Sequence, residues 1–186
     1  RRISISKLCK EQNIILIEDC AHSQGASFNK KKPGSWGEAG IYSLYATKTI
    51  STGEGGVLVS QNKELINFAK SYKNYGKPEN KIIGKNFRMS EFTAALGCVQ
   101  IDRLADIVSW KNEKVSNELK RFTNYLKLPT GMISGYYKFI VFNEINNSTG
   151  KVYDIGCHKI FNENVTLENT DWVNKNHWCV PIYYKG

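Results

Sequence analysis

Hydrophobic and polar positions in the first part of the chain follow first a helical and then a strand-like spacing. Apolar residues recur at helical spacing over residues 3–12, and four aliphatic residues then fill positions 14–17. A short apolar run of this kind is typical of a strand buried in a parallel sheet. A second strand is expected to begin at Ile41, where apolar and small residues alternate, and a third is expected over 56–60. Strands of this type point to an α/β fold.

Two helices are expected in the middle of the chain. The first covers residues 63–75 and ends where a glycine and a proline follow, because both residues terminate helices. The second begins after Ser90, a good N-cap residue, and its apolar spacing continues to about residue 125. Within this long helix, a break is expected near Trp110.

The helical pattern is interrupted at Leu128-Pro-Thr-Gly131, where the composition changes. Beyond this point the chain mixes short elements, with strand candidates at 136–142 and 177–183. We therefore predict two domains. Residues 1–127 form part of a large domain that includes the long helix, and residues 128–186 form part of a small C-terminal domain.

The composition limits the class of protein. The chain has 186 residues, of which 41% are hydrophobic, so it can form a substantial core. No apolar run reaches the roughly 18–20 residues of a membrane span, and no membrane partner is expected. Five cysteines without a Cys-x-x-Cys pair favour a reduced, cytoplasmic protein. Because the chain starts with Arg1-Arg2 and stops at Lys185-Gly186, we interpret it as an internal segment of a longer protein.

The formal net charge of +9 favours an anionic partner, which could be nucleic acid or a phosphate-bearing small molecule. The basic run Lys30-Lys31-Lys32 leads into a turn, and no nucleic-acid recognition pattern accompanies it, so no nucleic acid is expected. Cys157-His158 could be combined with His177 and Cys179 as zinc ligands. The spacing does not match the common zinc fingers, and no metal is expected.

One lysine, Lys48, lies among uncharged residues at the expected end of the strand that begins at Ile41, before a glycine-rich turn. Desolvation would make its amine a better nucleophile, whereas the alternative is a strand-end lysine that extends to solvent. Asp19 and Ser43 are expected near the ends of neighbouring strands. A lysine that forms an imine, a carboxylate that pairs with a ring nitrogen and a hydroxyl that binds phosphate would suit a pyridoxal phosphate site.

Several motifs occur in an order and spacing that resemble one known family. They are Ile17-Glu-Asp-Cys-Ala-His-Ser-Gln-Gly-Ala26, Gly34-Ser35, Ser43-Leu-Tyr-Ala-Thr-Lys48, Thr52-Gly-Glu-Gly-Gly56, Asn86-Phe-Arg-Met-Ser-Glu91, Tyr137-Lys138-Phe139 and His177-Trp-Cys-Val-Pro-Ile182. Together they resemble the DegT/DnrJ/EryC1/StrS family of pyridoxal-phosphate-dependent sugar aminotransferases. The resemblance covers nearly the whole chain.

The resemblance implies a fold and an activity. The fold is aspartate-aminotransferase-like (PLP fold type I), with a large α/β domain built on a mostly parallel sheet and a small α+β C-terminal domain. The implied cofactor is pyridoxal 5′-phosphate. The implied reaction moves an amino group from an amino acid, glutamate or glutamine, to a keto-sugar that is nucleotide-linked. The family's N-terminal portion, which holds the phosphate on a helix N-terminus, is expected to lie outside this chain.

The resemblance also assigns roles to residues. Lys48 matches the catalytic lysine, which binds the cofactor covalently and then transfers a proton. Asp19 matches the partner of the pyridine nitrogen, and Ser43 matches the hydroxyl that binds the cofactor phosphate. His22 lies where the family has a side chain packed on the cofactor ring, although an isolated histidine is more often structural.

Two further residues follow in one loop. Asn86 matches an asparagine that reaches the phosphate of the other subunit's cofactor, which implies a homodimer with a composite active site. Arg88 is a candidate for binding anionic substrate groups, with a structural salt bridge as an equal alternative. Two other activities stay open at this point. The chain could be an inactive relative that binds partners or regulates, or a sugar dehydratase, which Lys48 disfavours because that branch carries histidine at its position.

Overall fold

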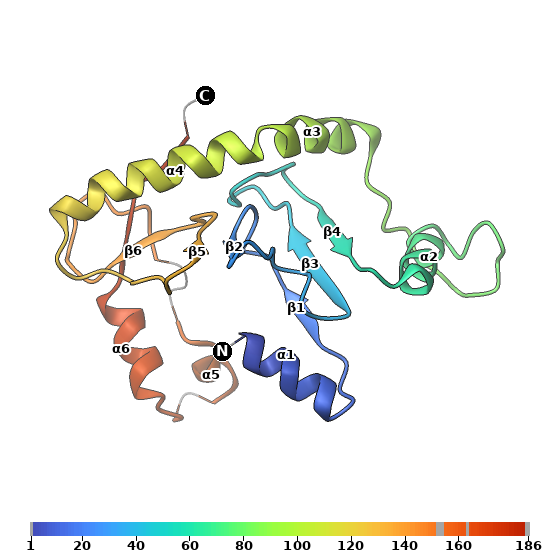
Figure 1. Ribbon diagram of the computed structural model, residues 1–186, viewed down its shortest axis with the longest axis horizontal. Coiled ribbons are helices and arrows are strands. Elements are labelled where there is room, and N and C mark those ends of the chain that lie inside the picture. The colour runs from blue at the N-terminus through green and yellow to red at the C-terminus, as the bar shows by residue number, and fades with distance from the viewer. Residues whose placement is uncertain (1, 152–154, 163, 185–186) are drawn as a thin grey trace. The chain divides into compact units, whose positions relative to one another are not determined.

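The computed structural model describes residues 2–151, 155–162 and 164–184 (Figure 1). The chain forms two compact units. The first unit contains the residues up to Val108 together with 131–137, and the second contains 109–130 together with the residues from 138 onward. These units follow contacts within this chain alone, and the division of the whole protein into domains at residues 127 and 128 stays a prediction.

The first unit is built on a three-stranded sheet with the order β1-β3-β4 (Figure 1). Strand β1 (Ile17–Asp19) runs parallel to β3 (Ala39–Ser43), and β3 runs antiparallel to β4 (Gly56–Val59). In the register, Asp19 lies opposite Ile41. The carboxyl ends of β1 and β3 therefore lie at the same edge of the sheet, where open α/β sheets place their ligands.

The expectation that residues 14–17 form a buried strand is wrong for this chain. The strand begins only at Ile17, and Ile15 is 75% exposed. The reason is that β1 is the edge strand of the three-stranded sheet, so its outer edge has no neighbouring strand among the residues that the structure describes. The aliphatic run is apolar enough for burial, but Ile14, Ile15 and Ile17 are left exposed by the residues that the structure describes.

The turn between β1 and β3 is fixed by Glu18. Its carboxylate accepts hydrogen bonds from the backbone N–H groups of Gly34, Trp36 and Gly37, at 2.9, 2.7 and 2.9 Å. Bonds from backbone amides to a charged acceptor are stronger than bonds between neutral groups. Successive side chains along a strand point to opposite faces of the sheet. Because the Glu18 side chain is bonded to the turn, the side chain of the next residue, Asp19, points away from it.

Helices surround the sheet. Helix α1 (Arg2–Glu11) precedes β1, and α2 (Lys63–Tyr72) begins at Asn62, whose side chain accepts bonds from two backbone N–H groups. Helix α3 (Glu91–Asp102) begins after Ser90, whose hydroxyl accepts from the N–H of Thr93, so the predicted N-cap is confirmed. In the described ranges, no helix is both long and apolar enough to cross a membrane.

The long helix breaks at Arg103 and not near Trp110. Helix α3 ends at Asp102, and α4 (Leu104–Glu118) continues directly, followed by a short 3-10 helix, η1 (Leu119–Arg121). The apolar positions do not mark this break, because Val99, Ile101 and Leu104 continue through it at steps of two and three residues. Trp110 lies inside α4, so the predicted position of the break is wrong.

A short antiparallel pairing brings residues 131–137 into the first unit. Strand β2 (Ser27–Phe28) pairs with β5 (Met132–Ile133), so that Ser27 lies opposite Ile133. Neither strand was expected from the apolar pattern, since each has only two residues. Their pairing joins two parts of the first unit that are about a hundred residues apart in the sequence.

The second unit has its own core. Strands β6 (Phe139–Val141) and β7 (Trp178–Val180) lie within the predicted strands at 136–142 and 177–183, although both are shorter. They pair antiparallel, which the sequence did not predict. Phe139, Val141 and Cys179 are fully buried between them and their neighbours. Helices α5 (Cys157–Phe161) and α6 (Glu168–Asn176) complete the described part of this unit.

Candidate active site

The sheet edge at the ends of β1 and β3 carries three of the predicted site residues. Asp19 is the last residue of β1, and Ser43 is the last residue of β3. Lys48 lies five residues beyond β3, in a turn where its backbone N–H donates to the carbonyl of Tyr45. The expectation of a lysine at the end of a buried strand is therefore wrong in detail, since Lys48 is half-buried in a loop.

Asp19, His22 and Lys48 are electrostatic neighbours. Partial burial and the ammonium group of Lys48 lower the pKa of His22, while the carboxylate of Asp19 acts in the opposite direction. The imidazole is therefore held in its neutral form near neutral pH. Asp19 itself accepts a hydrogen bond of 2.9 Å from the backbone N–H of Ala21, which fixes the carboxylate at the strand end. The three groups share one surface of the first unit.

Tyr137 joins this group. Its ring stacks on the imidazole of His22, with the ring centroids 4.0 Å apart and the planes inclined by 20°. The Nζ atom of Lys48 lies 4.9 Å from the centroid of the same Tyr137 ring. The Tyr137 hydroxyl is 3.3 Å from the hydroxyl of Thr47. Sequence reasoning used Tyr137 only as part of a family motif and did not assign it to the site.

The loop that carries Lys48 is held by polar side chains and carbonyl groups from three segments. The buried amide of Gln24 donates to the carbonyls of Ser43 and Ile50, at the two ends of the loop. Gln100 of α3 donates to the carbonyl of Ser51 at 3.1 Å, and Thr49 donates to the carbonyl of Gly135 at 3.0 Å. Gln24 and Gln100 are polar residues that sequence reasoning did not assign to the site.

Ser43 is placed at the sheet edge, but it is not in contact with Lys48. Its hydroxyl oxygen accepts a hydrogen bond of 3.2 Å from the backbone N–H of Tyr45. That bond uses an acceptor lone pair and leaves the hydroxyl hydrogen available as a donor. A donor at this edge is what a phosphate group would require, so the geometry agrees with the predicted role of Ser43 without testing it.

Asn86 and Arg88 form a separate pair. The side-chain oxygen of Asn86 accepts from Nε of Arg88 at 3.0 Å, and the Arg88 guanidinium lies 5.3 Å from the ring centroid of Tyr75. Both residues are exposed, and no hydrogen bond or ion pair connects them to Asp19 or Lys48 within the described ranges. Because Arg88 occupies the oxygen of the Asn86 amide, the amide NH₂ group is the part that is free to donate outward.

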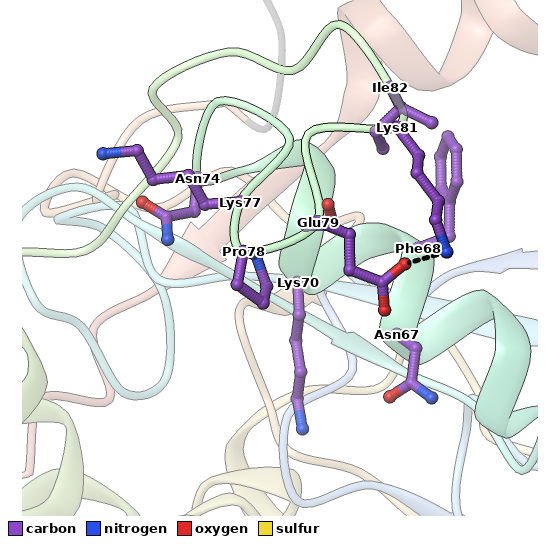
Figure 2. A pocket seen from close by; sticks show the side chains of 10 residues that line it. Asn67, Phe68, Lys70, Asn74, Lys77, Pro78, Glu79, Lys81 and Ile82 are labelled. Atoms are coloured by element: carbon purple, nitrogen blue, oxygen red, sulfur yellow. Dashed lines mark ion pairs between the residues drawn. The ribbon is translucent and has the colours of Figure 1, made fainter.

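A separate cavity lies beside helix α2 and does not belong to this group. It has a volume of about 590 Å³ and is lined by residues of α2 and of the loop that follows it (Figure 2). Figure 2 shows the ion pair between Glu79 and Lys81 on one side, with Lys77 on the other. None of the predicted site residues lines this cavity, and the one ion pair that it contains is solvent-exposed.

The candidate zinc ligands are engaged in other contacts. His158 pairs with Asp171 at 3.1 Å, and Nδ1 of the buried His177 lies 2.6 Å from the carbonyl oxygen of Val173. Among the residues that the structure describes, no group of three or more side chains is arranged to hold a metal ion. All five cysteines are present as free thiols.

The fold is shared with solved aminotransferase structures. The Helicobacter pylori protein PseC, described as an aminotransferase involved in the biosynthesis of pseudoaminic acid, superimposes with a TM-score of 0.79 at 22% identity. The match covers 97% of this chain and 57% of that protein. The fold is therefore of the aspartate-aminotransferase-like α/β class (PLP fold type I), and the predicted fold class is confirmed.

The family follows from the sequence profile. The profile described as the DegT/DnrJ/EryC1/StrS aminotransferase family matches residues 3–144, and the chain belongs to this family. A GDP-perosamine synthase of Escherichia coli O157:H7 is 35% identical over 59% of the chain. A UDP-4-amino-4,6-dideoxy-N-acetyl-beta-L-altrosamine transaminase of Campylobacter jejuni is 35% identical over 72% of the chain. The chain spans about a third of the length of these relatives, 31% and 38%.

Proposed function

We propose that the whole protein transfers an amino group from an amino acid, glutamate or glutamine, to a nucleotide-linked keto-sugar, with pyridoxal 5′-phosphate as cofactor. The observation that carries this proposal is the grouping of Asp19, His22 and Lys48 beside one sheet edge in a chain of this family. Curated relatives of the chain are named as synthases and transaminases of nucleotide-linked amino sugars. The net charge of +9 agrees with an anionic sugar nucleotide.

The side chains present fit the cofactor. Pyridoxal phosphate supplies an aldehyde and an electron-withdrawing pyridine ring. The amine of Lys48 is the nucleophile for the aldehyde, and no carboxylate forms an ion pair with it among the described residues. The carboxylate of Asp19, placed at the end of β1, would hold a proton at the ring nitrogen. The neutral imidazole of His22 offers a flat surface for packing, and the hydroxyl of Ser43 would donate to a phosphate oxygen.

In this proposal Lys48 also transfers a proton. The free amine of Lys48 would hold and move a proton at the carbon of the amino donor or of the sugar. This task requires an amine that stays near one place while it changes partners. The loop bonds from Gln24, Thr49 and Gln100 restrict that place. The half-buried position of Lys48 leaves it accessible to small molecules.

We also propose that the protein is a homodimer with a composite active site. Asn86 is exposed and its amide oxygen accepts from Arg88, so its NH₂ group is the part that would donate to a phosphate held by the partner subunit. Nearby apolar residues are uncovered, since Ile83 is 96% and Phe92 91% exposed. Within α3, Gly97 alone is buried, although the helix is apolar. In this proposal Arg88 orients Asn86 and, from the same position, contacts an anionic group of the substrate.

We also propose that the enzyme is cytoplasmic, because its five cysteines are free thiols.

The first experiment locates the covalent attachment. The full-length protein is mixed with pyridoxal phosphate, reduced with borohydride and digested, and the modified peptide is identified by mass spectrometry. We expect the modification on Lys48 and its absence in Lys48→Arg, which keeps the positive charge but cannot form the imine. Modification of another lysine in the wild-type protein would contradict the assignment.

A second measurement addresses the substrates. The full-length protein is supplied with glutamate or glutamine and a panel of nucleotide-linked keto-sugars, and amino-sugar products are detected by mass spectrometry. Formation of an amino sugar supports the proposal. A protein that carries the Lys48 adduct but releases a dehydrated sugar would be a dehydratase, and one that converts no sugar would be an inactive relative.

A further inference from the structure

The ring of Tyr137 contacts two of the proposed site residues, His22 and Lys48. The Tyr137 ring stacks on the imidazole of His22, and the Nζ atom of Lys48 lies 4.9 Å from the centroid of the same ring. Aromatic rings attract cations through the negative potential of the π face. An aromatic pair with centroids this close is also more favourable than its buried area alone would make it. The ring therefore has a favourable interaction with both partners.

Tyr137 and the nearby Gly135 are hydrogen-bonded to the Lys48 loop at two points. The Tyr137 hydroxyl is within hydrogen-bond distance of the hydroxyl of Thr47, the residue immediately before Lys48. Two residues earlier, the carbonyl of Gly135 accepts from the hydroxyl of Thr49, the residue immediately after Lys48. Gly135 is packed so closely that a Cβ atom there would lie 1.9 Å from the carbonyl oxygen of Gln24. The segment 135–137 thus contacts the chain on both sides of Lys48.

A purely structural role would not require this arrangement. Tyr137 is half-buried, and its ring stacks on His22, which is exposed, so the stack does not lie in the hydrophobic core. The neighbours of this ring include an imidazole, an ammonium group and the hydroxyl of Thr47. These neighbours are the chemical groups of the proposed site.

We propose that Tyr137 is a positioning residue for Lys48: its ring restrains the lysine amine beside His22 and Asp19 before any cofactor is bound. The proposal rests on the function assigned to Lys48, but its contacts are those of this chain alone. Without the ring, the amine would lose its cation–π partner and sample the solvent more freely. The consequence is that Lys48 should be less reactive toward a general acylating reagent in the wild type than in a variant without the ring.

The experiment measures the reactivity of Lys48 in the cofactor-free, full-length protein. Competitive acetylation with acetic anhydride at pH 8 is followed by peptide mass spectrometry, with Lys63 of α2 as the internal reference. We expect Y137L to raise the relative acetylation rate of Lys48 by about two- to fivefold, the loss expected for one exposed cation–π contact. We expect Y137F, which keeps the ring, to remain close to the wild type. Y183L serves as the matched control, because Tyr183 is 67% exposed and lies in the second unit.

A second readout reports on the stack. With ¹³C-labelled histidine, the His22 ring signal of the wild type should show the shift caused by a neighbouring aromatic ring, and this shift should disappear in Y137L and persist in Y137F. If Y137L does not fold, a nuclear Overhauser contact between the rings of His22 and Tyr137 in the wild type provides the test. Equal Lys48 reactivity in wild type and Y137L, or an absent ring contact, would overturn the proposal. Neither readout uses the cofactor, so a failed cofactor adduct on Lys48 would refute the proposed function separately.

Discussion

Two segments of the first unit that carry proposed site residues, those of Lys48 and of Asn86, are held in place differently. The Lys48 segment (residues 43–52) is bonded by Gln24, Gln100 and the segment 135–137, which come from three other parts of the chain. The Asn86 segment (residues 74–88) is held mainly by its own backbone. Tyr75 donates to the carbonyl of Lys85 at 3.2 Å, and Asn74 and Asn86 form an isolated bridge.

The difference shows two ways in which a functional side chain is held in position. Lys48 must act on a group held within the same chain, so bonds from elsewhere in the unit fix its position. Asn86 and Arg88 are exposed, their side chains are hydrogen-bonded to each other, and the Arg88 guanidinium lies over the ring of Tyr75. Such a pair has the position expected of groups that act on a partner subunit. The comparison therefore predicts that changes around Lys48 affect stability, whereas changes at Asn86 affect assembly and cofactor binding.

The largest expected effect comes from Gly135→Ala. A Cβ atom would lie 1.9 Å from the carbonyl oxygen of Gln24, so the backbone would have to move and the bond from Thr49 to residue 135 would be lost. We expect a loss of about 3 kcal/mol in the free energy of unfolding, measured by denaturant titration of the full-length protein. Gly97→Ala is the control, because its nearest neighbour would be at 3.5 Å and helix propensity favours alanine by up to ~1 kcal/mol. Equal stability of the two variants would contradict the close packing.

An intermediate effect is expected for Gln24→Leu. The variant removes the amide that donates to the carbonyls of Ser43 and Ile50 and leaves a buried carbonyl group without that partner. We expect a loss of about 2 kcal/mol in the free energy of unfolding. Asn86→Leu is the matched comparison in the other segment and should change this free energy by less than about 0.5 kcal/mol. The comparison between the segments would fail if the order of these two values were reversed.

The smallest effect is a pH dependence from His22. The pKa of His22 in the native state lies below its ordinary value of 6.5. Between these two pKa values, the unfolded state therefore binds more protons than the native state. Stability should therefore fall as the pH is lowered through 6.5 and should be independent of this group above it. Denaturant titrations at several pH values, compared with His22→Gln, measure the difference. A wild-type protein that gains stability on acidification relative to His22→Gln would show that the sign is wrong.

The sequence was sufficient for the elements with strong local signals and insufficient for the contacts between distant residues. The N-cap at Ser90 and the strands β4 and β6 follow from hydrogen-bonding side chains and apolar spacing. The break at Arg103 could not be predicted, because the apolar positions Val99, Ile101 and Leu104 continue through it. The exposure of Ile15 could not be predicted, since burial of an apolar run depends on which strands lie beside it.

The same distinction applies to the site. Asp19, His22 and Lys48 belong to motifs that are local in sequence, and the structure brings them together on one sheet edge. Tyr137 reaches them only because β5 pairs with β2, and a two-residue strand leaves no periodic pattern. Gln24 is polar, yet it is 3% exposed and donates to two carbonyl groups, which its residue type does not predict. The roles of Asn86 and Arg88 stay predictions, because they concern a partner subunit.

The bonds on either side of Lys48 also have a consequence for synthesis of the protein. Thr47 and Tyr137 are 90 residues apart in the chain, and Thr49 and Gly135 are 86 apart. A ribosome adds about 5–20 residues per second, so the lysine loop emerges roughly 5–20 s before the residues that bind it. During that interval Gln24 can already bond the loop, but the partners at residues 135 and 137 are missing. The loop around Lys48 therefore gains these bonds late, after the long helix has been made, and a nascent chain that stops before residue 135 cannot form them.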